Sequence, residues 1–574
     1  MRFAKLFLTV VASLGLNMSV LAADAQITDT SKISSQQLDE QVNQLLSQMT
    51  TEEKLLQLLS YKPNGVPRLG IPNLEAGEVL HGVVSGGCTS FPQSIALGAT
   101  WDPDLIERTA NVIAQEARAV GIDQGFAPML GLARDPRWGR VEESYGEDPF
   151  LVSRIAVAYI NGLQGKGPDR FGPDHIIATP KHFVADGEPW AGANGEDFET
   201  SERVLREVFM PPFEAAVKEA HTGSIMPAHH ALNGVPCHMN SWLLDTVLRR
   251  EWGFDGFATS DMGDIPKLAG GHKMAHDATE SAVFSLSAGV DMELVGELYM
   301  GSLLHALNVA KIPISVIDEA ARRVLREKIQ LLGIGTATDA PSEPPDEKTK
   351  QEILKYKGDD DIWAKLIAEG KFNTPASGRR PDWQKIVNDP SHDALALEAA
   401  QKAIVLLKNA NSLLPLDKTK LKKIAVVGPL ATQRNLGGYS TGKPKFYTSI
   451  LDGLKTYLGA SIEVGYAPGC QLKAATTELL APAVALAQAA DVVIAVVGHT
   501  RGQLGENLDR DDLGLIGGQL NLVQAMEATG KPVVVVFQNG APISEPWICD
   551  HIPTIVESWY LGQATGTEIG RAHV

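Results

Sequence analysis

A carboxylate at the end of a predicted buried strand is the first candidate for chemistry in this sequence. Residues 252–265 read W-G-F-D-G-F-A-T-S-D-M-G-D-I, and the apolar run stops at Thr259, Ser260 and Asp261. Buried parallel strands have nearly continuous apolar runs, and barrel enzymes carry catalytic groups at the C-terminal ends of such strands. Asp261 is therefore a candidate catalytic carboxylate. The alternative is a helix N-cap, because Ser and Asp after a strand often begin the next helix.

Two other segments carry polar groups that could bind a ligand. The apolar run I-I-A-T-P-K-H-F ends in Lys181 and His182, which could hydrogen-bond sugar hydroxyls from one side of a pocket. The alternative is a surface lysine beside a buried histidine. The segment R-D-P-R-W-G-R, 134–140, could bind a pair of hydroxyls or hold a carboxylate through its arginines. A solvated charged loop is the alternative there.

Regular alternation of apolar runs and helical patterns predicts the fold that positions these residues. Apolar runs at 122–130, 176–183, 224–230, 256–261 and 288–294 are each followed by a helical pattern. Such alternation over residues 38–335 predicts a (β/α)8 barrel. A doubly wound sheet is the alternative, but no G-x-G-x-x-G turn follows a strand.

A second domain and a linker are predicted in the remainder of the chain. Residues 336–393 are rich in proline and charge, which predicts a linker. An α/β unit over 394–574 has expected strands at 424–427, 492–497 and 533–537. We expect this α/β sandwich to be incomplete, because R-A-H-V, 571–574, ends the chain within a helical pattern.

The N-terminus and the composition predict an exported enzyme. Residues 1–23 combine a basic start, an apolar run and small residues, the pattern of a signal peptide. The alternative is a membrane anchor, but Asn17 and Ser19 interrupt the apolar run. We therefore expect a periplasmic or secreted protein. The net charge of −18 argues against nucleic acid or an anionic membrane as a partner.

The cysteines do not predict a metal site. They are widely spaced and form no C-x-x-C pair, so no zinc site is expected. One disulfide after export is compatible with this spacing, and its pairing stays open among Cys88, Cys237, Cys470 and Cys549.

The ordered motifs resemble glycoside hydrolase family 3. R-D-P-R-W-G-R with G-E-D-P, then K-H-F, then L-N-G-V-P with S-D-M resemble the first domain of that family. K-N-A-N-S-L-L-P-L at 408–416, G-G-Y-S, and T-G-K-P-V-V-V-V at 529–536 resemble its second domain. The resemblance runs from about residue 38 to residue 570.

The resemblance implies roles for particular residues. Asp261 matches the nucleophile of the family. The acid/base lies on a loop of the second domain, which L-G-E-N-L-D-R (504–510) resembles, so Glu506 is implied and Glu545 is a weaker competitor. Four residues match positions that bind the sugar in the −1 subsite: Glu78, Arg140, Lys181 and His182.

Two neighbours of Asp261 differ from the family pattern. His229 stands where the family often has tyrosine, and Met262 stands where it often has tryptophan. A histidine could still orient Asp261, and methionine still offers an apolar platform for the leaving-group sugar. These differences leave the substrate preference more open than the activity.

The implied reaction is retaining hydrolysis of a small β-linked oligosaccharide or aryl β-glycoside, without metal or cofactor. One carboxylate attacks the anomeric carbon and the other protonates the leaving oxygen. We expect Lys181 and Arg140 to keep Asp261 ionised, and a less polar wall to raise the pKa of Glu506. An exo-acting β-glucosidase is the first expectation and a β-xylosidase the second. An N-acetylhexosaminidase and an inactive carbohydrate-binding protein are further alternatives.

Overall fold

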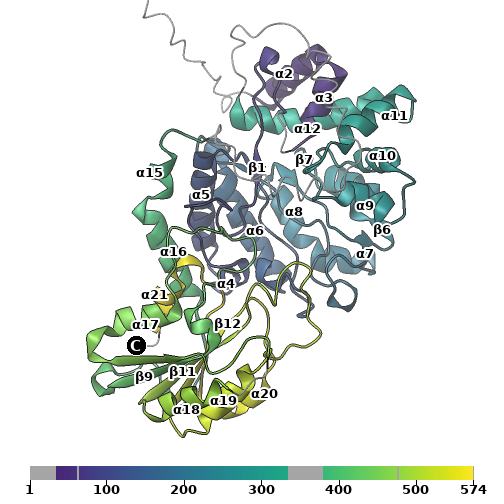
Figure 1. Cartoon of the computed structure of the whole chain (residues 1–574). Helices are drawn as coiled ribbons and strands as arrows, with labels where there is room; N and C mark the ends of the chain where they lie inside the picture. The colour runs from purple at the N-terminus through teal and green to yellow at the C-terminus, as the bar shows by residue number, and fades with distance from the viewer. Residues whose placement is uncertain (1–33, 61–63, 334–378, 475–477, 573–574) are drawn as a thin grey trace, which may run out of the picture.

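The computed structural model describes residues 34–60, 64–333, 379–474 and 478–572, which form two domains (Figure 1). The first domain runs from purple to teal in Figure 1, and the second from green to yellow. The predicted signal peptide, residues 1–23, lies outside the described ranges, as do residues 336–378 of the predicted linker.

Short parallel strands follow one another around the centre of the first domain. β1 (Ala76–Gly77), β2 (Gln124–Gly125) and β3 (Ile177–Ala178) pair in parallel, and so do β4 (Ser224–Ile225) and β7 (Phe257–Ala258). Parallel bridges join the neighbouring segments: Phe183 to Pro227, Thr259 to Met292, and Leu59 to Glu293. This ring with helices outside it is the barrel arrangement that the sequence predicts, and not a doubly wound sheet. All these strands point the same way, so the residues after β3 and β7 lie at one end of the barrel.

A buried glutamine links four strands inside the barrel. The Gln124 side-chain nitrogen lies 3.0, 3.2 and 3.0 Å from the hydroxyl oxygens of Thr179, Ser224 and Thr259, which share its two N–H groups. Buried polar groups need such partners, and these contacts tie the amide nitrogen of Gln124 to three neighbouring strand ends. The network therefore fixes the strand end that leads to Asp261.

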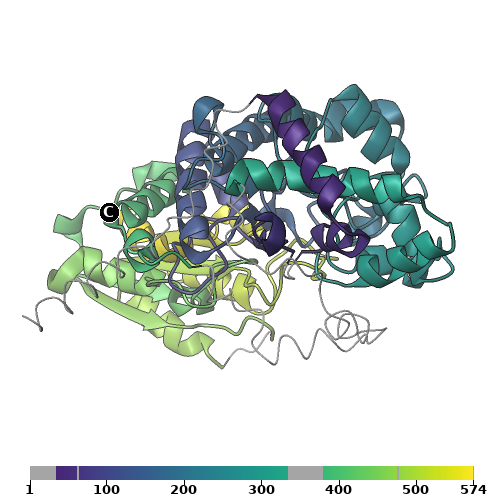
Figure 2. The same cartoon turned by 90° about the horizontal axis from the view of Figure 1, so that it is seen from above.

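Helices cover the outside of the ring, and their starts follow from local sequence. Asp102 and Asp148 cap two of the long helices of this wall, α5 and α6, and each is followed by a proline at the first helical position. The last long helix, α12, packs against the first, α2, at the end of the domain farthest from the second domain (Figure 2). The α-helices of the first domain are α2 (Ser35–Gln48), α3 (Thr51–Gln57), α4 (Ser94–Gly98), α5 (Pro103–Val120), α6 (Pro149–Gln164), α7 (Glu202–Val204), α8 (Pro211–Lys218), α9 (Asp264–Gly270), α10 (Ala278–Ala288), α11 (Leu304–Asn308) and α12 (Ile314–Leu332).

π-Helical turns and one hairpin complete the first domain. Leu205–Phe209, Trp242–Glu251 and Tyr299–Leu303 are π-helical. The hairpin strands β5 (Ala231–Leu232) and β6 (Val235–Pro236) are antiparallel and follow β4.

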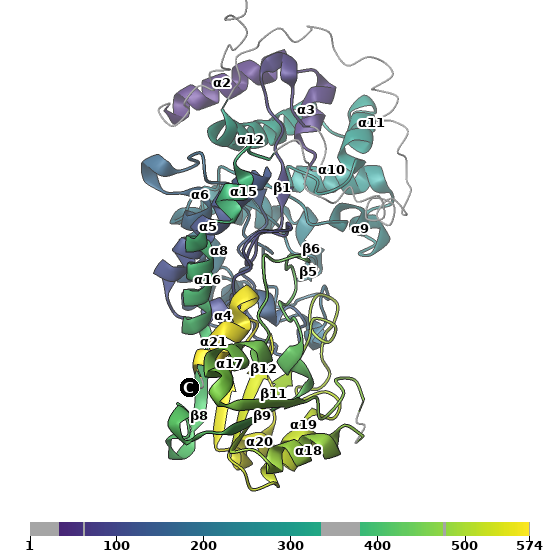
Figure 3. The same cartoon turned by 60° about the vertical axis from the view of Figure 1, so that its left-hand side comes forward.

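The second domain is a six-stranded sheet between two helical layers. Its strand order is β10-β9-β11-β12-β13-β8, parallel except for β8. Alternate residues of β9 and β11 belong to two separate apolar clusters, one with α17 and the other with α18 and α19 (Figure 3). The elements are β8 (Val405–Asn409), β9 (Lys423–Val427), β10 (Glu463–Ala467), β11 (Val492–Gly498), β12 (Val533–Gln538), β13 (Thr554–Glu557), α16 (Pro390–Ala403), α17 (Ile450–Leu458), α18 (Leu480–Gln488), α19 (Gln519–Glu527), α20 (Pro546–His551) and α21 (Thr565–Ala572).

The three strands predicted in this domain match β9, β11 and β12. The strands β8, β10 and β13 were not predicted. β8 and β10 are edge strands with partly exposed, mixed sequences, so neither shows a continuous apolar run. The α/β sandwich is confirmed, whereas nothing in the structure shows that the domain is incomplete.

The described end of the predicted linker is helical and packed. α15 (Trp383–Val387) and the start of α16 lie against α5. Arg380 donates its backbone N–H to Ala119 O at 2.9 Å, and Val387 is buried in the barrel's apolar cluster. Residues 379–393 therefore attach to the first domain, and are not an extended tether.

A buried carboxyl joins the two domains near the G-G-Y-S segment. Glu142 Oε1 accepts the N–H of Gly438 at 2.7 Å. Gln93 donates to the carbonyl of the same glycine at 2.7 Å. A Cβ at Gly438 would lie 2.6 Å from Glu142 Oε1, so any other residue here would push the carboxylate away. The contact holds the segment that leads to Tyr439.

Glu142 should make the stability of this junction depend on pH. Burial, assisted by the charge of Glu143, raises the pKa of Glu142 to about 8. An unfolded glutamate titrates near about 4.3, so the folded chain holds the proton longer. The contribution of Glu142 to the free energy of unfolding is therefore complete below about pH 4.3 and is lost as the pH rises to about 8.

The variant Glu142→Gln removes this ionisation and should flatten the pH dependence. Between pH 5 and 8, we expect the wild-type Tm to fall further than the variant's by at least about 2–4 °C, the shift that 1 kcal/mol produces in a domain of 150–250 residues. Thermal unfolding followed at several pH values measures this. Glu147→Gln, at an exposed carboxylate, is the control and should follow the wild type. Parallel curves for wild type and Glu142→Gln would contradict the prediction.

Candidate active site

Asp261 follows β7 and faces two imidazoles. Its Oδ2 lies 3.2 Å from His182 Nε2 and 3.0 Å from His229 Nε2. Its Oδ1 accepts the N–H of Met262 at 2.6 Å. The next helix, α9, begins at Asp264 with Gly263 as its N-cap. The helix-cap interpretation of Asp261 is therefore wrong.

Each of these imidazoles is held between two carboxylates. His182 Nδ1 bonds to Asp186, and His229 Nδ1 lies 2.8 Å from Asp264 Oδ2. A carboxylate on the far nitrogen fixes the orientation of a histidine ring. Both Nε2 atoms therefore point at the same oxygen of Asp261.

The pKa values around Asp261 follow from this arrangement. Burial alone would raise the pKa of Asp261, but the charge of His229 and hydrogen bonds from both histidines lower it well below its usual range. Burial alone would lower the pKa of His229, but Asp261 and Asp264 raise it well above its usual range. Asp261 is therefore ionised at neutral pH, as a nucleophile requires.

A third histidine supports the backbone of Asp261, and sequence reasoning missed it. Asp261 donates its backbone N–H to His238 Nε2 at 3.0 Å, so the ring proton is on Nδ1, 3.2 Å from Ala228 O. Burial lowers the pKa of His238 and keeps the ring neutral. No spacing in the sequence connects residue 238 to residue 261.

Lys181 and Glu78 form an ion pair across the end of the barrel. Lys181 Nζ lies 3.0 Å from both oxygens of Glu78. The lysine is buried, with 2% of its surface exposed, and the surface-lysine interpretation is therefore wrong. Burial raises the pKa of Glu78, and the charge of Lys181 opposes this rise.

Arg140 is buried and paired, unlike the other arginines of its segment. Its guanidinium bonds to both oxygens of Glu143 at 2.8 Å, and Nη1 lies 3.4 Å from His229 Nε2. The solvated-loop interpretation fails for Arg140, but it describes Arg134 and Arg137, whose side chains are about half exposed. We expected Lys181 and Arg140 to keep Asp261 ionised. This was wrong, because each is paired with another carboxylate and the two histidines make the contacts.

The second domain supplies Glu506 through a loop that docks on the barrel. Asp509 accepts the N–H groups of Gly139 and Asn194 at 2.8 and 2.7 Å. A Cβ at Gly139 would lie 2.2 Å from Gly505 O, so the two backbones are in close contact. Glu506 Oε1 lies 3.5 Å from Arg140 Nη1, at the same end of the barrel as Asp261.

Tyr439 holds the other oxygen of Glu506, and sequence reasoning gave it no role. Its hydroxyl donates to Glu506 Oε2 at 2.7 Å. Its ring lies 5.0 Å from Lys181 Nζ and 5.8 Å from the Arg140 guanidinium carbon. Its φ of 47° is rare for a residue other than glycine, and such strain gathers at functional sites. An aromatic residue directly after Gly437-Gly438 was the available signal.

The pKa of Glu506 differs from our expectation. Burial raises it, but the charge of Arg140, the hydrogen bond from Tyr439 and the charges of the histidines outweigh burial and lower it. We had expected a less polar wall to raise this pKa, which was wrong. The polar contacts of Arg140 and Tyr439 are the reason.

The separation of the two carboxylates favours a retaining site. His229 Nε2 lies 3.0 Å from Asp261 Oδ2 and 3.9 Å from Glu506 Oε1, so those oxygens are closer than the sum of these distances. This limit includes the separation of about 5–5.5 Å in retaining glycosidases and excludes most of the range of about 6.5–9.5 Å in inverting ones.

The remaining candidates are Met262 and Glu545. Met262 is 52% exposed beside Asp261, which suits an apolar platform at the mouth of the site. Glu545 precedes α20, and its Oε1 accepts the N–H of Leu515 at 2.6 Å. It is therefore bound within its own domain, and Glu506 is the better acid/base candidate.

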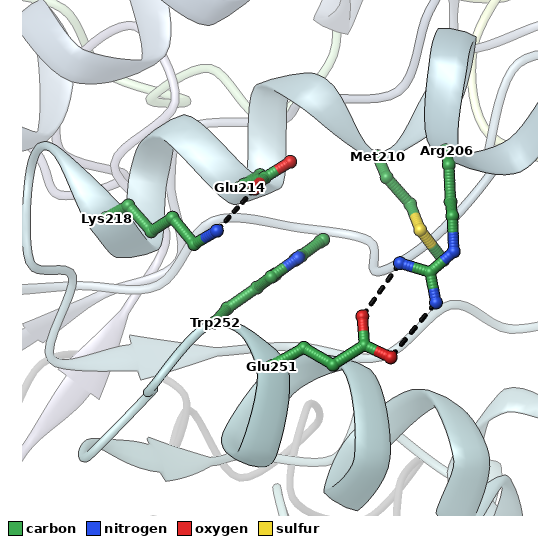
Figure 4. A pocket seen from close by; sticks show the side chains of 6 residues that line it. All are labelled: Arg206, Met210, Glu214, Lys218, Glu251 and Trp252. Atoms are coloured by element: carbon green, nitrogen blue, oxygen red, sulfur yellow. Dashed lines mark hydrogen bonds and ion pairs between the residues drawn. The ribbon is translucent and has the colours of Figure 1, made fainter.

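A separate surface pocket lies between α8 and the Trp242–Glu251 helix (Figure 4). Its charged groups pair with one another: Arg206 Nη1 with Glu251 at 2.8 Å, and Lys218 with Glu214 at 2.6 Å. Met210 and Trp252 line the rest. None of the predicted site residues lines this pocket, and its charges are already neutralised. The cluster around Asp261 remains the candidate site.

Within the described ranges, one group of side chains has the spacing to hold a metal ion: His182, His229 and Asp261.

Family models match both domains. The Glycosyl hydrolase family 3 N terminal domain matches residues 17–327, and the Glycosyl hydrolase family 3 C-terminal domain matches residues 404–572.

Relatives and solved structures agree with these matches. The chain is 42% identical to a β-xylosidase of Formosa agariphila, covering 94% of this chain and 72% of the relative. It is 31% identical to the periplasmic β-glucosidase of Salmonella typhimurium, covering 92% of this chain and 66% of that relative. A β-glucosidase structure from Erythrobacter marinus superposes with a TM-score of 0.80 at 28% identity, covering 94% of this chain and 76% of the other. The two-domain architecture, the ordered motifs and these matches together show that the chain belongs to glycoside hydrolase family 3.

Proposed function

We propose that the chain is an exo-acting, retaining β-xylosidase that removes terminal xylosyl residues from the non-reducing ends of short β-linked oligosaccharides. The observation that carries the proposal is the approach of two carboxylates from different domains, Asp261 and Glu506, to one imidazole. The Formosa relative, a β-xylosidase at 42% identity, favours xylose. The sequence alone had favoured β-glucosidase over β-xylosidase.

A β-glucosidase is the second candidate. The Salmonella relative and the Erythrobacter structure, both β-glucosidases, support it at lower identity. An N-acetylhexosaminidase is disfavoured, because such relatives are typically single-domain and use a barrel histidine as the acid/base. An inactive binding protein is disfavoured too, because both carboxylates and their partners are present.

In the proposed first step, Asp261 attacks the anomeric carbon while Glu506 protonates the leaving oxygen. The attacking oxygen is ionised before substrate arrives, because His182 and His229 stabilise its charge. The Lys181–Glu78 pair offers donors and acceptors to sugar hydroxyls. Substrate that fills the site excludes water and favours the protonated form of Glu506.

The charge balance then favours the second step. Once Asp261 is bonded to the sugar, its carboxyl group carries no charge. It then no longer balances the positive charge of His229. That charge lowers the pKa of Glu506, which lies 3.9 Å from His229 Nε2. Glu506 can therefore act as the base that activates water, and the two imidazoles stabilise Asp261 as it leaves.

We further propose that the enzyme acts outside the cytoplasm. The signal-peptide pattern of residues 1–23 and the periplasmic Salmonella relative support this. Within the described residues, no helix has the length and apolar character to cross a membrane.

Asp261→Asn should abolish turnover with little change in fold. The amide keeps the shape of the side chain but cannot attack, so kcat on a nitrophenyl β-xyloside should fall by several orders of magnitude. In the wild type, a 2-fluoro xyloside should label Asp261 covalently, which peptide mass spectrometry detects. Near-normal turnover by the variant, or label on another residue, would refute the assignment.

Glu506→Ala should affect poor leaving groups most. A nitrophenolate leaves without protonation, whereas the alcohol of xylobiose does not, so kcat/KM should fall more for xylobiose. Azide should restore part of the rate on the activated substrate and give a β-xylosyl azide. The matched control is Glu545→Ala, which should keep the ratio of the two rates unchanged. Equal losses on both substrates for Glu506→Ala would exclude it as the acid.

Substrate preference tests the choice between the two sugars. Aryl β-xyloside, β-glucoside and α-arabinoside with one common leaving group should give the highest kcat/KM for the xyloside, by at least about tenfold, or about 1.4 kcal/mol in transition-state binding. A higher value for the glucoside would favour the second candidate. Product analysis by NMR at early times should show retention of the β-anomer.

A further inference from the structure

The nucleophile cluster has the ligand types of a transition-metal site. His182, His229 and Asp261 each offer one ligand atom, and these atoms all lie within 4.8 Å of one another. Two imidazoles and one carboxylate form a donor set that binds Zn²⁺ or Cu²⁺ in preference to Mg²⁺ or Ca²⁺. We propose that these three residues bind one Zn²⁺ or Cu²⁺ ion, and that the bound ion excludes the substrate.

The distances between the ligand atoms already approach those of a bound site. Zinc lies about 2.0–2.2 Å from nitrogen and oxygen ligands, so neighbouring ligands of a tetrahedral site are about 3.3–3.5 Å apart. Asp261 Oδ2 lies 3.2 Å from His182 Nε2 and 3.0 Å from His229 Nε2. An ion would displace the Nε2 protons that face Asp261 and release them to solvent, and small movements of the side chains would open the triangle around it.

The surroundings of the two imidazoles are also those of metal ligands. A metal-bound histidine usually donates its other N–H to a carboxylate, which fixes the ring and strengthens the ligand. His182 has Asp186 in this position, and His229 has Asp264 at 2.8 Å. Both partners are buried, so the rings are held whether or not an ion is present.

The position of the site makes binding incompatible with catalysis. An ion on Asp261 Oδ2 would bind the carboxylate that must attack and would lie beside the space that the anomeric carbon must enter. This step rests on the proposed function, whereas ion binding itself does not. His229 supplies one of the two nitrogens, so the proposal depends on the residue that differs from the family pattern.

Calorimetry with Zn²⁺ alone tests the binding. Full-length wild-type protein, freed of metal by a chelator and dialysed, should bind one equivalent, and the ion should raise its Tm by mass action. His229→Tyr and His182→Gln should each weaken binding at least tenfold, and Asp264→Asn should weaken it by about 10–100-fold. The use of two ligand variants covers the case in which one of them does not fold.

The matched control is His276→Gln. His272 and His276 are four residues apart, outside the proposed site, and His276 is exposed. This variant should bind Zn²⁺ like the wild type. Failure of the wild type to bind, or equal binding by His229→Tyr and His182→Gln, would overturn the proposal.

Kinetics test the exclusion of substrate separately. Zn²⁺ should raise the apparent KM for the aryl xyloside without changing kcat, and Mg²⁺ at the same concentration should do neither. Inhibition that lowers kcat at constant KM would overturn the exclusion step. If Asp261→Asn remains fully active, the proposed function fails, but the calorimetric result still decides the ion site.

Discussion

The structure of the site depends on one buried charge, the carboxylate of Asp261. A buried carboxylate without partners would be protonated and could not attack carbon. Two imidazoles supply the partners, and each imidazole is in turn oriented by a second carboxylate. The chain therefore places Asp186, Asp261 and Asp264 around two rings that can share their protons. Removal of any member changes the charge and the orientation of the others.

The same constraint explains why the larger cations are paired elsewhere. Lys181 pairs with Glu78, and Arg140 pairs with Glu143. The charge of each cation is therefore balanced by a carboxylate other than Asp261. Only one guanidinium nitrogen of Arg140 points toward Glu506 and His229. The first domain therefore presents ion pairs at this contact between the domains. The second domain adds Glu506 and Tyr439, which are hydrogen-bonded to each other.

Sequence patterns were informative where the chemistry is local. Apolar runs that end in polar residues located Asp261, Lys181 and His182, because strand ends in a barrel gather at one end whatever their spacing in the chain. Contacts that depend on how the chain turns after a strand could not be predicted from the sequence. His238 reaches the backbone of Asp261 from a separate helical turn, and Tyr439 reaches Glu506 from another loop. Glu506 was identified only from the resemblance of its loop to the family, because a carboxylate on a loop belongs to no periodic pattern.

The errors about charge have a common cause. From the sequence, a lysine and an arginine near Asp261 were expected to pair with it, and the acid role implied for Glu506 led us to expect a less polar wall around it. Both predictions ignore side chains that only the fold brings close: the carboxylates beside Lys181 and Arg140 in the first case, and Arg140 and Tyr439 beside Glu506 in the second. Glu78 and Glu143 are 183 and 118 positions before Asp261 in the sequence, yet they take up the two cations. Histidine is then left as the partner of Asp261, and His229 belongs to the arrangement that keeps the nucleophile ionised.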